Sequence, residues 1–329
     1  MTNYWENRNV LVTGCTGFLG SWLCEELINA KANVVGIIRD WVPKSRLLSE
    51  NMTSSMTSVR APIEDLSAIE RTINEYEIET VFHLAAQTIV GTANRDPVGT
   101  FETNIKGTWN LLEACRRIGS VKNIVVASSD KAYGIQENLP YDETMNLNGN
   151  FPYDVSKACT DLLAQSYYAS FELPVCITRC ANFYGGGDLN FNRLVPGTIM
   201  SLLRGENPLI RSDGSYIRDY LYIKDAARAC MKLAEKMETS EIKGEAFNIS
   251  SEVRCRADEL VHRITTIMGL ETLQPIIQNQ ASREIPHQYL SSKKSMDLLE
   301  WEPAYSLEQG LIETIHWYEK FYKENQQHD

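Results

Sequence analysis

The chain has 329 residues, of which 43% are hydrophobic and 23% are charged. This composition is typical of a folded globular protein and excludes global disorder and a fibrous repeat. The formal net charge of -11 would repel a polyanion, so we expect no nucleic-acid partner. No stretch approaches the roughly 18 uninterrupted apolar residues of a membrane helix, and the polar segment 1–8 lacks the layout of a signal or transit peptide. We therefore expect a cytoplasmic protein with no membrane partner.

The cysteines and histidines form no metal-binding pattern. The 8 cysteines are scattered singly without a C-x-x-C pair, and the 5 histidines are equally dispersed. We expect reduced, mostly buried thiols and no metal site. His83 lies in an apolar run, which favours a hydrogen-bonded core histidine over a ligand.

Short apolar runs alternate with amphipathic stretches through the first half of the chain. Continuous apolar strands between helices are typical of a parallel sheet that is covered on both faces. The sequence therefore predicts an α/β protein with a doubly wound parallel sheet, a Rossmann fold. The predicted strands are 10–12, 34–38, 81–84, 124–128 and 175–178, the predicted helices are 21–30, 61–76, 98–118 and 153–171, and 51–58 is a predicted polar loop.

The texture of the sequence changes after Asn182. A glycine cluster at 185–187 is followed by short apolar runs and by predicted helices near 193–204, 225–237, 257–268 and 306–323. We expect residues 1–181 to form a dinucleotide-binding domain. Residues 182–329 would form a smaller substrate-binding lobe, with some segments returning to the first domain.

Three glycines follow the first predicted strand and open the first predicted helix. Gly14, Gly17 and Gly20 stand in the spacing G-x-x-G-x-x-G, which allows a tight turn and close approach of the backbone to a pyrophosphate at a helix N-terminus. This context predicts dinucleotide binding. Arg39 and Asp40 stand at the end of the second predicted strand. A carboxylate there suits the ribose hydroxyls of NAD, whereas an arginine suits the 2′-phosphate of NADP. The sequence therefore leaves the choice between NAD and NADP open.

A second group of residues indicates proton transfer. Tyr153 and Lys157 are four residues apart and share one helix face. We expect the lysine to lower the pKa of the phenol, and Ser129, at the end of a strand, to hydrogen-bond the phenolate or a substrate alcohol. Together they suit the oxidation of an alcohol by hydride transfer.

With these motifs, the sequence resembles the extended short-chain dehydrogenase/reductase superfamily, whose members modify nucleotide-activated sugars. Within it, the chain is most similar to the CDP-glucose 4,6-dehydratases. The superfamily resemblance also rests on residues 83–87, 103–108, 218–225 and 298–303, and the narrower one on residues 4–5, 129–131, 185–188 and 192–196.

The resemblance implies a role for each candidate residue. Those that would hold NAD or NADP, tightly bound and regenerated in each turnover, are Gly14, Gly17, Phe18, Leu19, Gly20, Arg39, Asp40, Ile63, Leu84, Ala85, Ala86, Asn104, Tyr153 and Lys157. Those that would contact a nucleotide-diphosphate sugar are Gln87, Asn182, Arg193 and Arg218, although a turn-forming asparagine and surface arginines are the alternative. Pro62 stands where relatives carry an adenine-facing aspartate, and residues 36–39 resemble the NADP-using GDP-mannose dehydratases.

The implied activity is a nucleotide-sugar 4,6-dehydratase. Tyr153 would take the C4 hydroxyl proton, protonated Asp130 would donate to the departing C6 hydroxyl, and Lys131, if neutral, would remove the C5 proton. The candidate catalytic set is Ser129, Asp130, Lys131, Tyr153 and Lys157. An ordinary ion pair between Asp130 and Lys131 is the alternative for those two residues.

Two other functions stay open. A 4-epimerase or 4-reductase would use Ser129, Tyr153 and Lys157 alone, and a cofactor-sensing protein would bind without turnover. The helices at 98–118 and 153–171 carry apolar residues on more than one face, and the resemblance implies that they form the interface of a homodimer.

Overall fold

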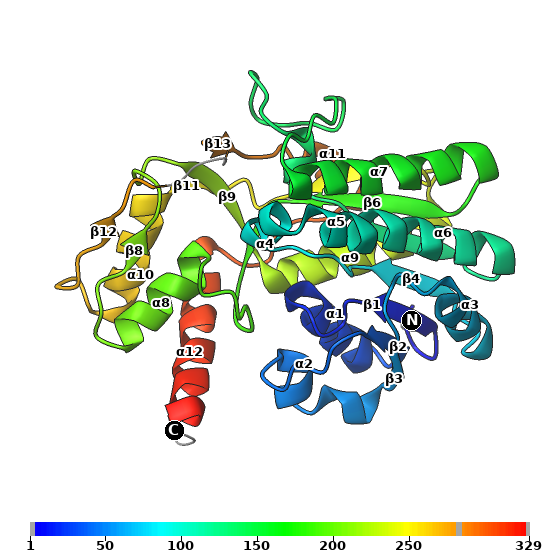
Figure 1. Cartoon of the computed structure of the whole chain (residues 1–329), viewed down its shortest axis with the longest axis horizontal. Coiled ribbons are helices and arrows are strands. Elements are labelled where there is room, and N and C mark those ends of the chain that lie inside the picture. Colours follow the sequence, from blue (N-terminus) through cyan, green and yellow to red (C-terminus); the bar gives the residue numbers. More distant parts are fainter. Residues whose placement is uncertain (1–3, 281–284, 327–329) are drawn as a thin grey trace.

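A seven-stranded parallel sheet forms the centre of the molecule (Figure 1). The computed structural model describes residues 4–280 and 285–326. The strand order β10-β6-β5-β4-β1-β2-β3 reverses direction at β1, as in a doubly wound fold, so the predicted fold class is confirmed. The strands are β1 (Asn9–Thr13), β2 (Asn33–Ile38), β3 (Thr57–Arg60), β4 (Thr80–His83), β5 (Asn123–Ala127), β6 (Val175–Cys180) and β10 (Ala246–Ile249).

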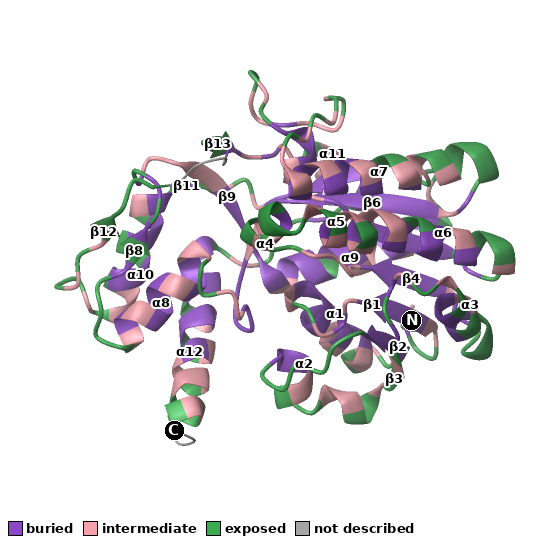
Figure 2. Ribbon diagram, in the orientation of Figure 1, coloured by how far each residue is buried: buried purple, intermediate pink, exposed green. Residues whose placement is uncertain are grey.

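Helices cover both faces of this sheet, and Figure 2 shows that the buried residues gather between the layers. Alternate strand residues supply the two cores, because successive side chains of a strand point to opposite faces. Val10 and Val12 pack with α1 (Phe18–Asn29) and α9 (Ile223–Thr239). Leu11 packs on the other side, in a core that also includes residues of α3 (Leu66–Glu75), α6 (Gly107–Ile118) and α7 (Pro152–Phe171). This two-sided burial explains the continuous apolar runs.

The structure corrects the sequence prediction at the edge of the sheet. The segment predicted as a loop at 51–58 instead forms a 3₁₀ turn, Met52–Ser55, and the start of β3. This strand pairs in parallel with β2, but three of its four residues are exposed, so it lacks the apolar signal of a buried strand. The helix predicted at 61–76 begins only at Leu66, because the Asp65 side chain caps it by accepting a hydrogen bond from Ala68 N.

The segment predicted as one helix over 98–118 has three parts. It begins with α5 (Pro97–Phe101), continues through a π-helical turn, Glu102–Lys106, and ends with α6. The turn leaves the apolar periodicity almost unchanged, so the sequence gives no sign of it. Its one buried residue is Asn104, and π-helical turns of this kind often occur at functional sites.

The second half of the chain contributes to both parts of the molecule. Strand β10 extends the large sheet beside β6, and α9 packs against α1. The remaining elements lie mostly to the left in Figure 1. They are β7 (Asn182–Tyr184), α8 (Leu194–Leu203), β8 (Leu209–Ile210), β9 (Ile217–Tyr222), β11 (Arg254–Arg256), α10 (Ala257–Met268), β12 (Ile276–Ile277), β13 (His287–Gln288), α11 (Lys293–Leu299) and α12 (Leu307–Gln326). The domain boundary after residue 181 stays a prediction.

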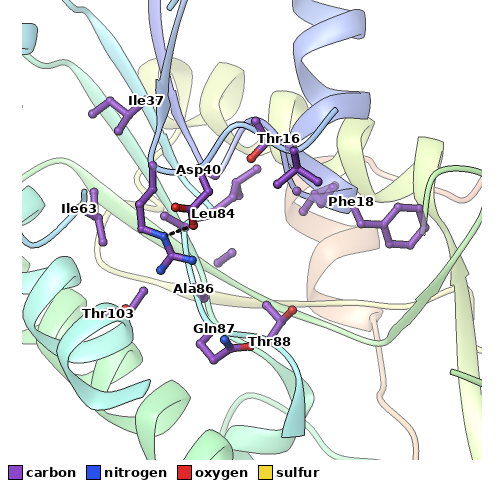
Figure 3. Close-up of a pocket in the computed structure, with 18 of the residues that line it drawn as sticks. Thr16, Phe18, Ile37, Asp40, Ile63, Leu84, Ala86, Gln87, Thr88 and Thr103 are labelled. Atoms are coloured by element: carbon purple, nitrogen blue, oxygen red, sulfur yellow. Dashed lines mark hydrogen bonds and ion pairs between the residues drawn. The ribbon is translucent and has the colours of Figure 1, made fainter. Parts of the chain in front are cut away.

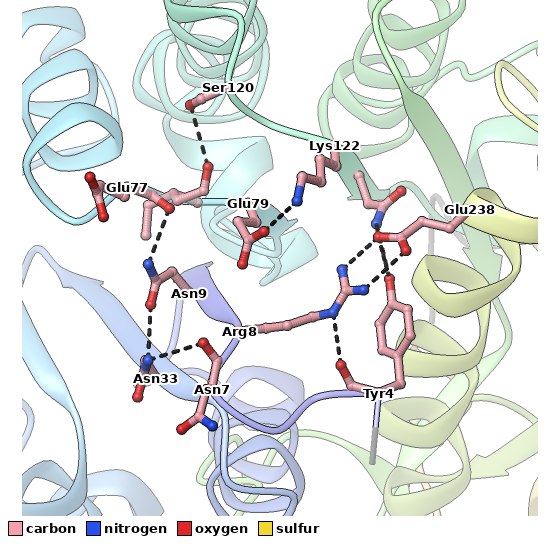
Figure 4. Close-up of polar contacts among 12 residues, drawn as sticks. Tyr4, Asn7, Arg8, Asn9, Asn33, Glu77, Glu79, Ser120, Lys122 and Glu238 are labelled. Atoms are coloured by element: carbon pink, nitrogen blue, oxygen red, sulfur yellow. Dashed lines mark hydrogen bonds and ion pairs between the residues drawn. The ribbon is translucent and has the colours of Figure 1, made fainter. Parts of the chain in front are cut away.

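Polar contacts fasten the N-terminal segment to α9 and β5 (Figure 4). Arg8 forms a 2.5 Å ion pair with Glu238 of α9, and Tyr4 Oη and Asn123 Nδ2 each donate to the same carboxylate over 2.9 Å. Burial alone would raise the pKa of Glu238, but these partners hold it at about 2. The carboxylate therefore stays ionised and joins the N-terminal segment, β5 and α9.

Among the described residues, no helix is both long and apolar enough to cross a membrane.

Candidate active site

The turn between β1 and α1 brings three glycines together. Gly14 has φ +70°, and a Cβ there would lie 2.8 Å from Ala85 N. A Cβ on Gly20 would lie 2.1 Å from Gly14 O, and one on Gly17 would lie 3.0 Å from it. A side chain at Gly14 or Gly20 would clash with neighbouring backbone atoms, so the backbone itself is open to the cleft at these positions, at the N-terminus of α1. The cradle suits a pyrophosphate, which accepts hydrogen bonds from free N–H groups.

A cleft opens from this turn along the carboxyl ends of the parallel strands, where doubly wound folds bind their ligands (Figure 3). Most of the candidate cofactor residues line it. They are Gly14, Gly17, Phe18, Leu19, Gly20, Arg39, Asp40, Ile63, Leu84, Ala85, Ala86, Tyr153 and Lys157. Two candidate substrate residues, Gln87 and Arg193, line it too. The fit of the cleft to a dinucleotide therefore rests on its shape, the glycine cradle and a helix N-terminus.

One end of the cleft carries a charged pair. Arg39 Nε donates to Asp40 Oδ2 over 2.6 Å, as the dashed line in Figure 3 shows. Both side chains are more than half exposed, so the pair can open at little energetic cost. Beside it, Ala61 and Ile63 are buried. With Pro62 in place of an aspartate, this wall is apolar.

The electrostatics of Tyr153 correct the expectation from the sequence. Tyr153 is buried, and burial raises the pKa of its phenol above the usual range, although Arg193 and a hydrogen bond with Ser129 oppose this. Lys157 is buried as well; its Nζ donates to Ala127 O over 2.7 Å, and burial lowers the pKa of the ammonium to about 8. Burial therefore has the largest effect on the pKa of the phenol, and the groups that oppose it are Arg193 and Ser129 rather than Lys157.

Ser129 and Asp130 lie next to this tyrosine at the end of β5. Asp130 is 2% exposed, Ser129 Oγ donates to its Oδ1 over 2.9 Å, and its Oδ2 is buried with no hydrogen-bond partner. Burial raises the pKa of Asp130, against the opposing effects of Lys131 and Arg218. A protonated carboxyl at this place can donate a proton to a leaving group.

Lys131 follows in the same turn. Its Nζ donates to Gln288 Oε1 over 3.2 Å, so the side chain points toward β13. Gln288 is fully buried, and its Nε2 has no hydrogen-bond partner.

The other candidate substrate residues lie on β7, β9 and the N-terminal end of α8. Asn182 Nδ2 is buried without a hydrogen-bond partner. Arg193 forms a 2.9 Å ion pair with Asp188 at the cleft. Arg218 does not line the cleft; its Nη1 donates to the carbonyls of Ile217 and Pro286. The structure thus brings Arg193 to the cleft, whereas Arg218 lies outside it and close enough to Asp130 to lower the pKa of that carboxyl.

Asn104 lies behind the cleft wall rather than in it. Its Oδ1 accepts from Gln87 N over 2.7 Å, and its Nδ2 donates to Gln87 O and to Ser156 Oγ over 3.1 and 2.8 Å. Its side chain therefore fixes the backbone at Gln87 against α7.

Sequence reasoning missed several residues of the cleft. They are Thr16, Ile37, Val42, Ala61, Thr88, Thr103, Ala127, Ser128 and Phe183. Thr16 lies inside the glycine motif and Thr103 directly precedes Asn104, so these two could have been found from their neighbours. Val42 and Phe183 belong to segments without a motif.

Comparisons with known proteins agree with this geometry. A family model described as GDP-mannose 4,6 dehydratase matches residues 11–314. CDP-glucose 4,6-dehydratase of Salmonella typhimurium is 30% identical over 96% of this chain and 92% of its own length. Among solved structures, UDP-glucose 4-epimerase of Thermotoga maritima is 30% identical, with a TM-score of 0.87 over 95% of this chain and 99% of its own. The NAD complex of Bacillus anthracis dTDP-glucose 4,6-dehydratase is 27% identical, with a TM-score of 0.85 over 95% of this chain and 97% of its own.

The fold, the glycine cradle and the Tyr153–Lys157 pair define an extended short-chain dehydrogenase/reductase of the NAD-dependent epimerase/dehydratase superfamily. The resemblance seen in the sequence is therefore confirmed. Proteins of this superfamily are enzymes. More narrowly, the chain belongs to the GDP-mannose 4,6 dehydratase family.

Proposed function

We propose that the protein is a nucleotide-sugar 4,6-dehydratase of the CDP-glucose type, which converts its substrate to a 4-keto-6-deoxy sugar. The observation that carries this proposal is Asp130, a buried carboxyl beside Ser129 and Tyr153. Alcohol oxidation alone needs no acid of this kind, whereas loss of water from C6 needs a proton donor for the departing hydroxyl. The Salmonella relative, a CDP-glucose 4,6-dehydratase, supports the same reading.

The cleft residues would hold NAD or NADP. Gly14, Gly17 and Gly20 would bind the pyrophosphate, and the segment 84–87 would lie along the ribose and nicotinamide. When bound, the cofactor accepts a hydride from C4 of the sugar and returns it to C6, so it is regenerated in each turnover.

Tyr153 would accept the proton of the C4 hydroxyl, while the hydrogen on C4 leaves as hydride. Burial raises the pKa of the phenol and so favours its protonated form, and the phenol must lose this proton before it can act as a base. Arg193 and Lys157 are the cations on this side of the cleft, and Arg193 lowers the pKa of the phenol. Because the pKa of Lys157 is about 8, this lysine can itself take up or release a proton near neutral pH.

Elimination needs an acid for C6 and a base for C5. Asp130 is the acid that we propose for C6, because burial raises its pKa and so favours the protonated form. Lys131 is the base that we propose for C5. Asp154 of α7 lies close enough to both groups to interact electrostatically with Asp130 and with Lys131.

We propose NAD as the preferred cofactor. A 2′-phosphate would have to displace Asp40 from Arg39 and would then lie beside a carboxylate. The NAD complex of the Bacillus dehydratase supports this choice. Titration with NAD and NADP should give the lower dissociation constant for NAD, and an Asp40→Ser variant should reduce that preference.

We also propose a homodimer formed through α6 and α7. These helices expose large apolar side chains, among them Trp109, Leu162 and Phe171 at 43%, 55% and 55%. Light scattering should give twice the chain mass, and Leu162→Glu should shift the protein to monomer.

The protein would act in the cytoplasm, because 8 free thiols, most of them buried, suit a reducing compartment.

The alternative activity is 4-epimerisation, which the similarity to the Thermotoga epimerase favours. One experiment separates the two reactions. CDP-glucose, dTDP-glucose and UDP-glucose are incubated with the enzyme and NAD in deuterated water. A dehydratase incorporates deuterium at C5 and forms a 6-deoxy-4-keto product, whereas an epimerase leaves C5 and C6 unlabelled and inverts C4.

A further inference from the structure

A buried hydrogen-bond network connects the cofactor wall to the helix that carries Tyr153. At its centre is His83, the last residue of β4, which is 2% exposed. Its Nδ1 lies 2.9 Å from Thr13 Oγ1 at the end of β1. Its Nε2 lies 3.0 Å from Thr108 Oγ1 of α6. The imidazole therefore bridges two elements that are far apart in the sequence.

Hydrogen-bond counting on Thr13 fixes one side of the ring. Thr13 Oγ1 accepts from Leu84 N over 3.1 Å and from Ala85 N over 3.2 Å. These backbone groups can only donate, so both lone pairs of the hydroxyl are used. Its proton must then go to His83 Nδ1, which consequently carries none.

The same counting on Thr108 fixes the other side. Thr108 Oγ1 donates to Asn104 O over 2.6 Å, and that carbonyl can only accept. Toward His83 the hydroxyl is therefore an acceptor, so Nε2 carries the proton. The two threonines select one neutral tautomer of the ring.

The charge state agrees with this assignment. Burial, together with the nearby Lys157, lowers the pKa of His83 to about 3. A second proton would also leave Nδ1 and Thr13 Oγ1 with two hydrogens between them and no lone pair. His83 is thus neutral throughout the physiological pH range and supplies no proton to the reaction.

The network ends at groups that face the cleft. Through Thr13 it holds the amides of Leu84 and Ala85, two residues of the cleft wall. Through Thr108 it holds the backbone of Asn104 in the π-helical turn, whose side chain binds Gln87 and Ser156. Thr160 of α7 donates to the same Asn104 carbonyl over 3.0 Å. One ring therefore sets the position of the segment 84–87 relative to α7.

We propose that His83, as the neutral tautomer with its proton on Nε2, is a positioning residue that sets the distance between the nicotinamide wall and Tyr153. This inference rests on the proposed function for its catalytic consequence, but the tautomer and the network do not depend on the substrate. Misplacement of reacting groups by about 1 Å can reduce a rate about 100-fold. Loss of the ring nitrogens should therefore slow hydride transfer more than it weakens cofactor binding.

The first test reads the tautomer directly. In the full-length protein with NAD bound and ¹⁵N-labelled histidine, the His83 signals should show a protonated Nε2 and a bare Nδ1. They should not change between pH 5.5 and 8.5, although an unperturbed histidine titrates at about 6.5. A proton on Nδ1, or titration in this range, overturns the proposal.

The second test measures the consequence for the cofactor. His83→Phe keeps an aromatic ring without nitrogens, and Thr108→Val removes the hydroxyl that His83 meets. Each should slow single-turnover cofactor reduction about tenfold or more, raise the dissociation constant of NADH less than threefold, and shift the emission of bound NADH. The double variant should show about the same loss as either single variant, because both break one network.

A matched control is Thr72→Val in α3. Thr72 is also buried and its hydroxyl also donates to the carbonyl four residues before it, Ala68 O, over 2.7 Å, but it does not line the cleft. This variant should lose some stability and leave NADH emission unchanged. Additive losses in the double variant, or equal effects of Thr72→Val and Thr108→Val on emission, would assign His83 a purely structural role. If the wild type dehydrates none of the three sugar nucleotides, the proposed function fails, while NMR and NADH emission still decide the role of His83.

Discussion

The two halves of the site differ in how their buried polar groups are paired. On the cofactor side, Thr13, His83 and Asn104 all make hydrogen bonds within the protein. On the substrate side, Asp130 Oδ2, Asn182 Nδ2, Asp219 Oδ1 and Gln288 Nε2 are buried with no hydrogen-bond partner. A buried polar atom without a partner destabilises the fold by about 1 to 3 kcal/mol. The cofactor side is therefore paired within the protein, whereas the substrate side holds buried polar atoms without partners, on side chains that do not line the cleft.

The largest effect on activity is expected at the phenol of Tyr153, which lies between the two halves of the site. Tyr153→Phe removes the proton acceptor for C4 and should lower kcat about 1,000-fold, within the range for a lost acid–base group. The dissociation constant of NADH should change little, because the glycine cradle is intact. Stopped-flow absorbance and NADH fluorescence measure the two quantities.

Tyr167→Phe, on the same helix, is the control for this substitution. Tyr167 bonds Glu113 at the protein surface and should tolerate the loss of its hydroxyl. Equal kcat values for Tyr153→Phe and the wild type would contradict the assigned role.

A somewhat smaller effect is expected for the acid on the substrate side. Asp130→Asn should slow loss of water about 100-fold and leave C4 oxidation nearly unchanged, because asparagine cannot donate a proton to the leaving hydroxyl. The variant should therefore accumulate reduced cofactor at 340 nm. Asp142→Asn, in an exposed loop turn where Asp142 accepts from Thr144, is the control. If oxidation and elimination fall together in Asp130→Asn, the separate roles of the two halves are wrong.

On the cofactor side, the cradle should be sensitive to one added carbon. Gly14→Ala combines a left-handed backbone with a Cβ 2.8 Å from Ala85 N, and backbone strain of this kind costs about 1 to 3 kcal/mol. The dissociation constant of NAD should rise at least about tenfold, as calorimetry can measure. Gly119→Ala has a similar φ of +73° but no atom within 4 Å of its Cβ. This control separates backbone strain from the clash, so equal NAD binding by both variants would contradict the cradle.

The smallest effect concerns the pH dependence of stability. Burial raises the pKa of Asp219 to about 7 from an ordinary 3.8. Between pH 3.8 and 7, the folded protein binds a proton at Asp219 that the unfolded chain has lost. The contribution of Asp219 to the free energy of unfolding is therefore fully present below about pH 3.8 and is lost as the pH rises to 7. Asp219→Asn should remove this contribution, and its Tm should gain on the wild type between pH 5 and 8. Asp213→Asn, at a fully exposed carboxyl, is the control and should not change the slope of Tm against pH. Parallel Tm curves for Asp219→Asn and the wild type would show that Asp219 is not buried in a protonated state.

The contrast also explains what the sequence could predict. The glycine turn and the Tyr153–Lys157 pair are local motifs, so they were found without knowledge of the fold. The network around His83 joins residues 13, 83 and 108 from three elements, and no spacing along the chain reveals it. The short edge strand at 57–60 was missed because its residues are polar. The pKa of Tyr153 was expected to fall, because the sequence shows a neighbouring charge but not the burial that opposes it.

The place of β10 has a consequence for synthesis of the chain. This strand occupies one edge of the sheet beside β6, yet its residues, 246–249, are translated only after β7, α8, β8, β9 and α9. A nascent chain that stops at residue 181 would leave β6 with an open, apolar edge, which is a hazard for aggregation. We expect such a fragment to be insoluble, whereas a chain that extends beyond Ile249 can complete the sheet.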